Sequence, residues 1–185
     1  MKVEASPEDV TSLLDQYKTT IQPKQSTGEL VYADIPVMFA RAEIMSNIYS
    51  ELEGIVGESA TGVLKKIGKS YGEMFFELLS NHQAEILEDK EKIFNHICAE
   101  TEAIGWGRIS IEEFPDKIVV ISDQGMATAR NYKEQSQHPV DSYFLGYFEG
   151  FFSKLNNTTY YGVETECVAK GDSRCKMEFG TEPVF

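Results

Sequence analysis

The sequence predicts an α+β domain in which a helical layer packs on an antiparallel sheet. Two observations indicate this fold class. Apolar residues recur at helical spacing through most of the first hundred residues, whereas after residue 105 they alternate as they do in half-buried strands. The resulting order of helices, hairpin, helix and hairpin is typical of an antiparallel sheet covered by helices.

The composition limits the classes of partner. The chain has 185 residues, which fits one domain with at most an additional arm. Its 17 Lys and Arg residues against 30 Asp and Glu give a net charge of −13, which argues against nucleic acid and anionic membranes. The N-terminus lacks the apolar stretch of a secretory signal, and the sequence shows no membrane span, so we expect a cytoplasmic protein with reduced thiols.

The first 27 residues are expected to form a separate arm. Ser6 can cap a helix that has Pro7 at its first position, and apolar residues follow at helical spacing. The polar segment 22–28, with Pro23 and Gly28, is typical of a linker. The sequence therefore predicts an arm over residues 1–27 and a domain over residues 28–185. The apolar side of the arm helix would rest on the body or on a second subunit.

The elements of the domain follow from the pattern of apolar residues. Residues 29–39 are extended in character, and Pro36 favours an edge or an interruption. Residues 123–139 are polar and irregular. Helices are predicted at about 42–56, 59–80, 88–103 and 140–155, and strands at 106–114, 117–122, 160–169 and 174–179.

Two of these helices carry paired glycines. Gly68 and Gly72 lie four residues apart in one helix, and Gly146 and Gly150 do so in another. A glycine inside a helix costs about 1 kcal/mol relative to alanine, so four of them indicate a requirement of packing or of a cavity. Small residues at this spacing let two backbones approach closely. We therefore expect the two helices to cross at their glycines.

The last predicted hairpin holds the residues with the richest chemistry. Cys167 and Cys175 lie four residues on either side of Gly171, so they would face each other across a turn centred there. Two thiolates at this distance can share Zn²⁺. The other interpretations are two packed thiols or, less in keeping with a cytoplasmic setting, a disulfide.

Further ligands for such a metal have several candidates, namely Glu164, Glu166, Asp141 and His138. Glu164 precedes Cys167 by three residues, so on a regular strand the two side chains would point to opposite faces. Glu164 could join the site only through a bulge or a twist, and Gly162 nearby favours a bulge.

At this point the sequence resembles the 4-vinyl reductase domain family. The segment Glu164 to Cys175 is similar to its signature, an acidic residue followed by Cys-x-Ala-x-Gly-Asp-x-x-Cys. Gly146-Tyr147 with Gly150-Phe151 resembles the family's Gly-Tyr-x-x-Gly-Phe helix, and residues 104–108 resemble its Gly-Trp-Gly strand start. Gly68 and Gly72 match its paired helix glycines. The resemblance covers about residues 29–179 and leaves the arm outside.

The resemblance implies a fold shared with the small vesicle-tethering subunits of the TRAPP complex and with sensor domains of aromatic-responsive regulators. It also implies a homodimer, a small hydrophobic effector and a structural zinc ion. By position, the implied ligands are Asp141, Glu164, Cys167 and Cys175, with Asp141 where the family has a cysteine. Aspartate can ligate zinc. His138, three residues earlier, could replace it. Four protein ligands would close the tetrahedron and leave no open position for catalysis.

The aromatic residues near the helical glycines are the candidates for ligand contacts. Such residues usually form the core, but together with glycines they can also line an apolar cavity. With the resemblance, the preferred hypothesis is a regulatory module that binds a small hydrophobic or aromatic effector. The candidate contacts are Tyr71, Phe75, Trp106, Tyr147 and Phe151.

Two other functions stay open: a tetrapyrrole vinyl reductase or its accessory subunit, and a TRAPP-like scaffold. The sequence shows no dinucleotide fingerprint, Walker loop or Ser/His/Asp motif, and its three histidines have no recognisable spacing, so an enzyme is the less favoured interpretation. It also shows no DNA-binding or ATPase segment, so an output would pass through a partner protein or a dimer interface.

Overall fold

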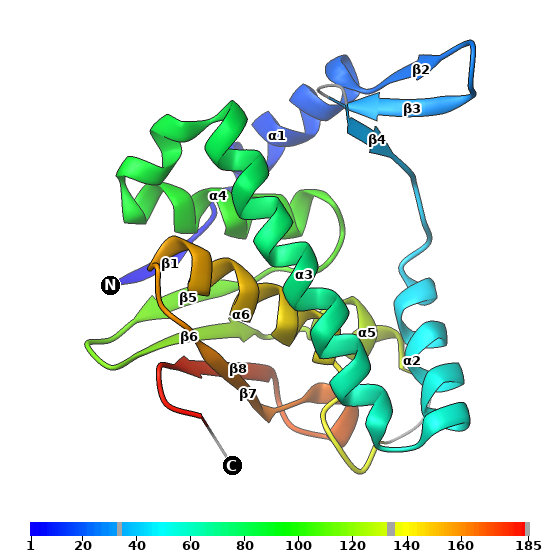
Figure 1. The fold of residues 1–185 in the computed structure, drawn as a ribbon, viewed down its shortest axis with the longest axis vertical. Coiled ribbons are helices and arrows are strands. Elements are labelled where there is room, and N and C mark those ends of the chain that lie inside the picture. The colour runs from blue at the N-terminus through cyan, green and yellow to red at the C-terminus, as the bar shows by residue number, and fades with distance from the viewer. Residues whose placement is uncertain (33–34, 133–135, 184–185) are drawn as a thin grey trace.

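The computed structural model of the chain describes residues 1–32, 35–132 and 136–183. Its centre is a five-stranded antiparallel sheet in the order β1-β5-β6-β8-β7 (Figure 1). The strands are β1 (Lys2–Glu4), β5 (Ser110–Glu113), β6 (Lys117–Ser122), β7 (Tyr161–Glu166) and β8 (Cys175–Gly180). Helices cover one face of the sheet, which confirms the predicted α+β class.

Helices α3 (Ser59–His82) and α6 (Ser142–Leu155) form the centre of the helical layer. In Figure 1, α6 lies between α3 and the sheet. Its apolar side chains are almost completely buried because this helix contacts the sheet on one side and α3 on the other. The fully buried aromatic residues of the core are Phe94, Phe144, Phe148, Phe151, Phe152 and Phe179.

The glycines of α3 and α6 meet as the sequence predicts. A Cβ atom added to Gly68 would lie 1.9 Å from the carbonyl oxygen of Tyr143, and one added to Gly146 would lie 1.9 Å from that of Lys65. Both distances are far below van der Waals contact, so no larger residue fits while the helices keep this separation. The glycines are therefore required by backbone-to-backbone packing.

The remaining helices surround this pair. Helix α4 (Lys90–Ala103) begins at Asp89, whose carboxylate accepts hydrogen bonds from the amides of Glu91 and Lys92, and it contacts β1 and β5. Helix α2 (Glu43–Val56) contacts α3 and the short helix α5 (Ala127–Asn131). Two 3₁₀ turns complete the order, η1 (Ala84–Glu88) and η2 (Val168–Lys170).

The N-terminal part combines a helix with a small sheet. Helix α1 (Pro7–Thr20) starts with a capping box between Ser6 and Asp9 and packs on α4. A second sheet follows, formed by β2 (Gln22–Lys24), β3 (Glu29–Tyr32) and β4 (Ile35–Val37) in that order. In Figure 1 this hairpin region projects from the body, and a thin segment leads from β4 down to α2.

Several local predictions were wrong. The segment 22–28 is not only a linker, because residues 22–24 pair with β3. Residues 2–4 form the edge strand beside β5, and α5 lies inside the segment predicted to be irregular. The first strand of the 106–122 hairpin begins only at Ser110, since Gly105 and Gly107 have positive φ angles. The division of the chain at residue 27 stays a prediction.

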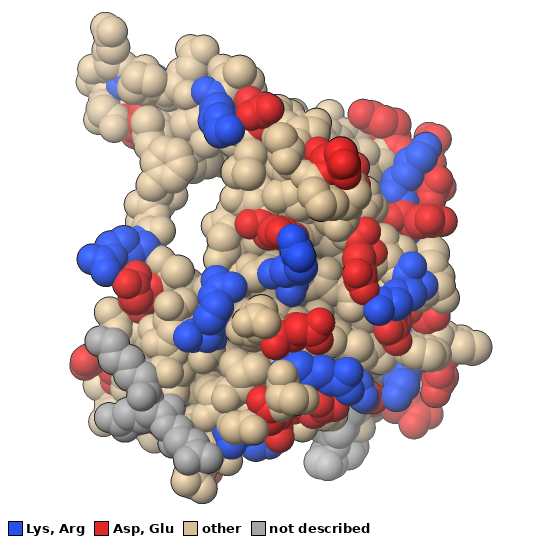
Figure 2. Space-filling view, turned by 180° about the vertical axis from the view of Figure 1, so that it is seen from behind, with Lys and Arg blue, Asp and Glu red and all other residues tan. Residues whose placement is uncertain are grey.

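The surface carries charges of both signs. Figure 2 shows lysine and arginine side chains interspersed with aspartate and glutamate on one face, and an opening between the body and the segment that leads from the arm. Within the described part of the chain, no helix is both long enough and apolar enough to cross a membrane.

Candidate functional site

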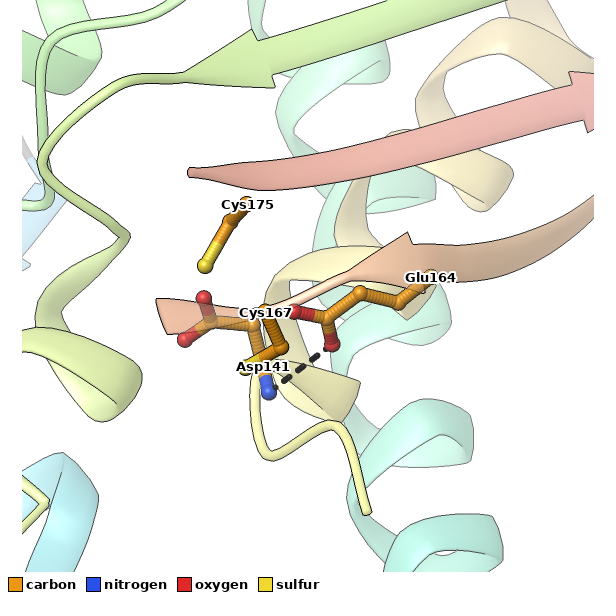
Figure 3. A group of neighbouring side chains, drawn as sticks. All are labelled: Asp141, Glu164, Cys167 and Cys175. Atoms are coloured by element: carbon orange, nitrogen blue, oxygen red, sulfur yellow. Dashed lines mark hydrogen bonds between the residues drawn. The ribbon is translucent and has the colours of Figure 1, made fainter. Parts of the chain in front are cut away.

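The four residues implied as metal ligands lie together in the structure. Asp141, Glu164, Cys167 and Cys175 each offer one ligand atom, and these atoms all lie within 4.8 Å of one another (Figure 3). All four residues are buried. They come from three places in the fold: the start of α6, the end of β7 with the turn after it, and the first residue of β8.

A strand irregularity brings Glu164 to this cluster. The pairing of β7 with β8 shifts register between Glu164 and Glu166, which places an extra residue in β7. This confirms the bulge that the sequence requires. Cys167 then lies just beyond the end of β7 and is not paired with Cys175, which pairs with Ser122 of β6. The prediction of a directly facing cysteine pair was therefore wrong, although both sulfur atoms reach the same point.

The turn between the cysteines is held by its own backbone and by one aspartate. The amide of Cys167 donates a hydrogen bond of 2.8 Å to Asp172 Oδ2, and the amide of Val168 donates one of 3.3 Å to Cys175 Sγ. Gly171 ends the 3₁₀ turn with φ of 95°, a conformation that favours glycine. These contacts position both sulfur atoms without help from a metal.

The two carboxylates of the cluster are only partly satisfied. Asp141 Oδ1 accepts a hydrogen bond from the amide of Ala129 at 3.0 Å, and Glu164 Oε2 accepts one from the amide of Asp141 at 3.1 Å, drawn as a dashed line in Figure 3. Asp141 Oδ2 and Glu164 Oε1 are buried and have no hydrogen-bond partner among the described residues. An unsatisfied buried oxygen of this kind calls for a ligand or an ion.

The crowding of acidic groups changes their protonation. Burial, together with the charge of Cys167, raises the pKa of Asp141 to about 7. Burial, together with the charge of Asp141, raises the pKa of Glu164 well above its usual value. A hydrogen bond from Cys175 lowers the pKa of Cys167 to about 6, and the same bond raises that of Cys175. Because these groups oppose one another's ionisation, a divalent cation would favour all four charged forms.

These residues fit zinc by their chemistry. Two thiolates and two carboxylates are donors that Zn²⁺ accepts, and the two unpartnered oxygens supply free lone pairs inside the cluster. Bound zinc would connect the start of α6 to the last hairpin. It would have a structural role, because four protein ligands leave no position for a substrate.

Two other candidates for the metal site lie elsewhere. His138 is 46% exposed and places Nε2 3.7 Å from Glu53 Oε1, outside the cluster. Glu166 forms a two-pronged ion pair with Arg174, with bonds of 2.9 and 3.1 Å. The structure therefore favours Asp141 over His138 as the neighbour of the cysteines.

The five residues predicted to contact a ligand also lie together. Tyr71 and Phe75 of α3 contact Tyr147 of α6, with ring centroids 5.9 Å apart in both pairs, and Trp106 lies 5.1 Å from Tyr147. Phe151 lies 5.9 Å from Phe75. We call these five residues the aromatic cluster.

The aromatic cluster runs from the surface into the core. Phe75, Tyr147 and Phe151 are buried, Trp106 is half-buried, and Tyr71 is 37% exposed. The inner rings are thus part of the core, as aromatic residues commonly are. Tyr71 and Trp106, whose centroids are 5.9 Å apart, form its accessible end.

A hollow of about 380 Å³ lies outside the aromatic cluster. It opens between α2 and α5 and is lined by Ser46, Asn47, Ser50, Glu53, Gly54, Asn131 and Tyr132. This mainly polar lining differs from the apolar lining that a hydrophobic effector requires.

Comparison with known proteins places the metal cluster in a family segment. Residues 127–181 match the family model of the vinyl-4-reductase domain. We call them the family segment. It contains all four residues of the metal cluster, along with Tyr147 and Phe151 of the aromatic cluster. The resemblance to this family is therefore confirmed. A search of curated proteins gave no match to the chain.

Two solved structures show the same fold at low sequence identity. The phenol-responsive sensory domain of the transcription activator PoxR, solved with phenol, has a TM-score of 0.74 and 16% identity over 93% of this chain and 90% of that chain. A trafficking protein particle complex subunit 3 from Naegleria fowleri, covalently bound to palmitic acid, has a TM-score of 0.57 and 9% identity over 78% of this chain and 96% of that chain. Around the family segment, the fold thus extends over most of the chain.

The sequence analysis missed one polar residue beside the aromatic cluster. Glu100 lies on α4, and its buried Oε2 atom has no hydrogen-bond partner in the described part of the chain. A single acid within a charged helix carries no motif, so only the folded structure distinguishes it from its neighbours.

Proposed function

We propose that this chain is a regulatory domain that binds a small hydrophobic effector and is stabilised by a structural zinc ion. The observation that carries the proposal is the convergence of four buried donor groups beside the start of α6, the helix that also carries two residues of the aromatic cluster. The shared fold with a phenol-responsive sensory domain supports the effector. A cytoplasmic setting, where thiols stay reduced, suits two thiolate ligands.

The effector would enter at Tyr71 and Trp106. These two side chains retain access to solvent, whereas the rings behind them fill the core, so the effector would have to displace side chains as it enters. Burial of an aromatic ring against such faces is favourable, and the apolar lining selects for hydrophobic compounds. Binding would produce a signal only if it favours one of two conformations.

Metal content provides the direct test of the zinc site. Native mass spectrometry with elemental analysis, on protein purified without added zinc, should find a single zinc ion per chain. Cys167→Ala should abolish the metal and lower the melting temperature. The matched control is Cys98→Ala, since Cys98 is a buried thiol in the main core, away from the cluster, and this variant should retain zinc. Metal-free wild-type protein that stays metal-free after zinc is added would refute the site.

Effector binding can be followed through Trp106, because the chain has one tryptophan and it lies in the aromatic cluster. Titration with phenol-sized aromatic compounds should change its fluorescence in a saturable way. Tyr71→Ala should weaken binding, whereas Tyr160→Ala, a ring change outside the aromatic cluster, should not. If no compound of this class binds, a scaffold becomes the better interpretation.

We also propose that the active form is a homodimer. Helices α2 and α3 expose a set of large apolar side chains that a monomer would leave in water: Ile44, Ile48, Ile55, Val63, Ile67 and Met74. An exposed apolar surface of this kind usually marks an interface. A second copy of the chain, to which the same surface belongs, is the partner that we propose.

Light scattering of the purified protein tests the dimer. Wild-type protein should show the mass of two chains, and Ile67→Glu should shift it toward one. Lys92→Glu, an exposed charge change on α4, is the control and should leave the mass unchanged. A monomeric wild-type protein at micromolar concentration would contradict the dimer but not the zinc or effector proposals.

A further inference from the structure

Glu100 provides a buried acceptor between the arm and the body. Its side chain is only 17% exposed. Oε1 accepts a hydrogen bond of 3.2 Å from the hydroxyl of Tyr17, which belongs to α1. Oε2 is buried and has no hydrogen-bond partner among the residues that the structure describes. A carboxylate oxygen removed from water in this way lacks compensation for its lost hydration.

Aromatic rings surround this carboxylate from four elements. They are Tyr17 of α1, Tyr32 of β3, Tyr71 of α3 and Tyr147 of α6. Burial raises the pKa of all four hydroxyls, and the negative charge of Glu100 raises each of them further, which shows that its field reaches every ring. Two of these rings, Tyr71 and Tyr147, belong to the aromatic cluster.

The rings also contact one another. Tyr17 and Tyr32 meet edge to face with centroids 5.1 Å apart, and Tyr71 lies 5.9 Å from both Tyr147 and Trp106. The surroundings of Glu100 are therefore continuous with the accessible end of the aromatic cluster. The opening in Figure 2 is bounded by the arm, which carries Tyr17, and by the body.

Glu100 lacks a permanent positive partner. Its one ion-pair contact within the described residues is His96, one helical turn earlier, with Nε2 3.4 Å from Oε2. A histidine carries a charge only when it is protonated, and an ordinary histidine is neutral at mildly alkaline pH. The carboxylate is thus available to a cation from outside the chain.

We propose that Glu100 and the tyrosine rings around it recognise the polar end of the effector, and that this end is a protonated amine attached to an aromatic group. This inference rests on the proposed effector function and specifies the chemical class of the ligand. An ammonium group donates to the unpartnered Oε2 and is attracted by the faces of the rings. A neutral hydroxyl gains only the hydrogen bond, and a carboxylate ligand would be repelled by Glu100.

The test compares two ligands of equal size with the full chain. Benzylamine, which is protonated at pH 8, and benzyl alcohol, which is neutral, are titrated at pH 8 while Trp106 fluorescence is recorded. Benzylamine should bind at least about tenfold more tightly, since a charge-assisted hydrogen bond and cation–π contacts each contribute. Equal affinities for the two compounds would overturn the inference and leave the effector function intact.

Variants of Glu100 separate its charge from its shape. Glu100→Gln should remove the preference for benzylamine while changing the affinity for benzyl alcohol by less than about threefold. Glu102→Gln, the same change on the same helix at a carboxylate paired with Arg108, should keep the preference. If Glu100→Gln does not fold, Glu100→Asp, which keeps the charge but withdraws it by one methylene, should weaken benzylamine binding selectively.

Two results would count against the inference at this stage. An undiminished preference in Glu100→Gln would assign the recognition of the amine to another group. Failure of both compounds to bind the wild-type protein would refute the effector function itself. The two failures are distinguishable, because only the second leaves Trp106 fluorescence unchanged by either ligand.

Discussion

Replacing Gly72 by alanine tests the packing at the centre of the fold. The added Cβ would lie 2.0 Å from the carbonyl oxygen of Tyr147 and 3.0 Å from the amide nitrogen of Phe151. Ordinary contact between such atoms needs about 3.5 Å, so α3 and α6 would have to separate locally by more than about 1 Å. Both atoms belong to a helix backbone and cannot rotate away.

The expected loss of stability follows from two opposing effects. Overpacking of a core costs typically about 1–3 kcal/mol and occasionally more, and the rigid backbone here favours the upper end of that range. The higher helix propensity of alanine returns about 1 kcal/mol. We therefore expect Gly72→Ala to lower the free energy of unfolding by about 2 kcal/mol or more. For a chain of this size, that corresponds to a fall of about 4–8 °C in melting temperature.

Urea unfolding monitored by circular dichroism, at one fixed protein concentration, measures this change. Gly62→Ala is the matched control, because Gly62 lies in the same helix and a Cβ there meets no atom within 4 Å. This control should be up to about 1 kcal/mol more stable than the wild type. If Gly72→Ala is as stable as Gly62→Ala, the close contact of the two helices is refuted.

Three further predictions concern the ion pairs and the last turn. Glu149 accepts a hydrogen bond from the amide of Gly162 and pairs with Lys65 at 2.7 Å; because both lysines around it keep about a third of their exposure, Glu149→Gln should cost about 1–3 kcal/mol in urea unfolding, and an unchanged midpoint would contradict this. Burial alone would raise the pKa of Glu149, but the bonds from Lys65 and Gly162 outweigh it and lower the pKa, so this stabilisation should be present above pH 4.5 and be lost on further acidification in the wild type only, as melting curves across pH would show. Gly171→Ala should destabilise the protein by about 1 kcal/mol, since Gly171 has φ of 95°, and a gain in melting temperature would be inconsistent with that conformation.

The sequence predicted those parts of the fold that have a long pattern. The helices from residue 43 onward and the strands β6 and β8 all carry several apolar residues at a constant period. The crossing of α3 and α6 was predicted because glycines four residues apart have a specific cost and a specific use. By contrast, β1 and β2 have three residues each, and α5 has five, which is too short for periodicity to be detected.

The candidate sites show the same limit. Cys167 and Cys175 were expected to face each other because spacing alone assumes a regular hairpin, whereas the bulge at Glu164 moves Cys167 beyond the strand. The bulge itself could be inferred, since Glu164 could not otherwise reach the sulfur atoms. The environment of Glu100 depends on side chains from four separate elements. No local pattern encodes such a meeting.

Helix α6 is held at its beginning, middle and far half. Asp141 anchors its first turn through Ala129, the glycines fix its separation from α3, and Glu149 is bound from two sides. A displacement along its axis would drive carbonyl oxygens of one helix into the backbone of the other. This helix therefore cannot serve as a piston between an occupied ligand site and the rest of the molecule. Motion that transmits a signal has to occur in the parts mounted around it, such as the projecting arm, while α6 stays still as their common axis.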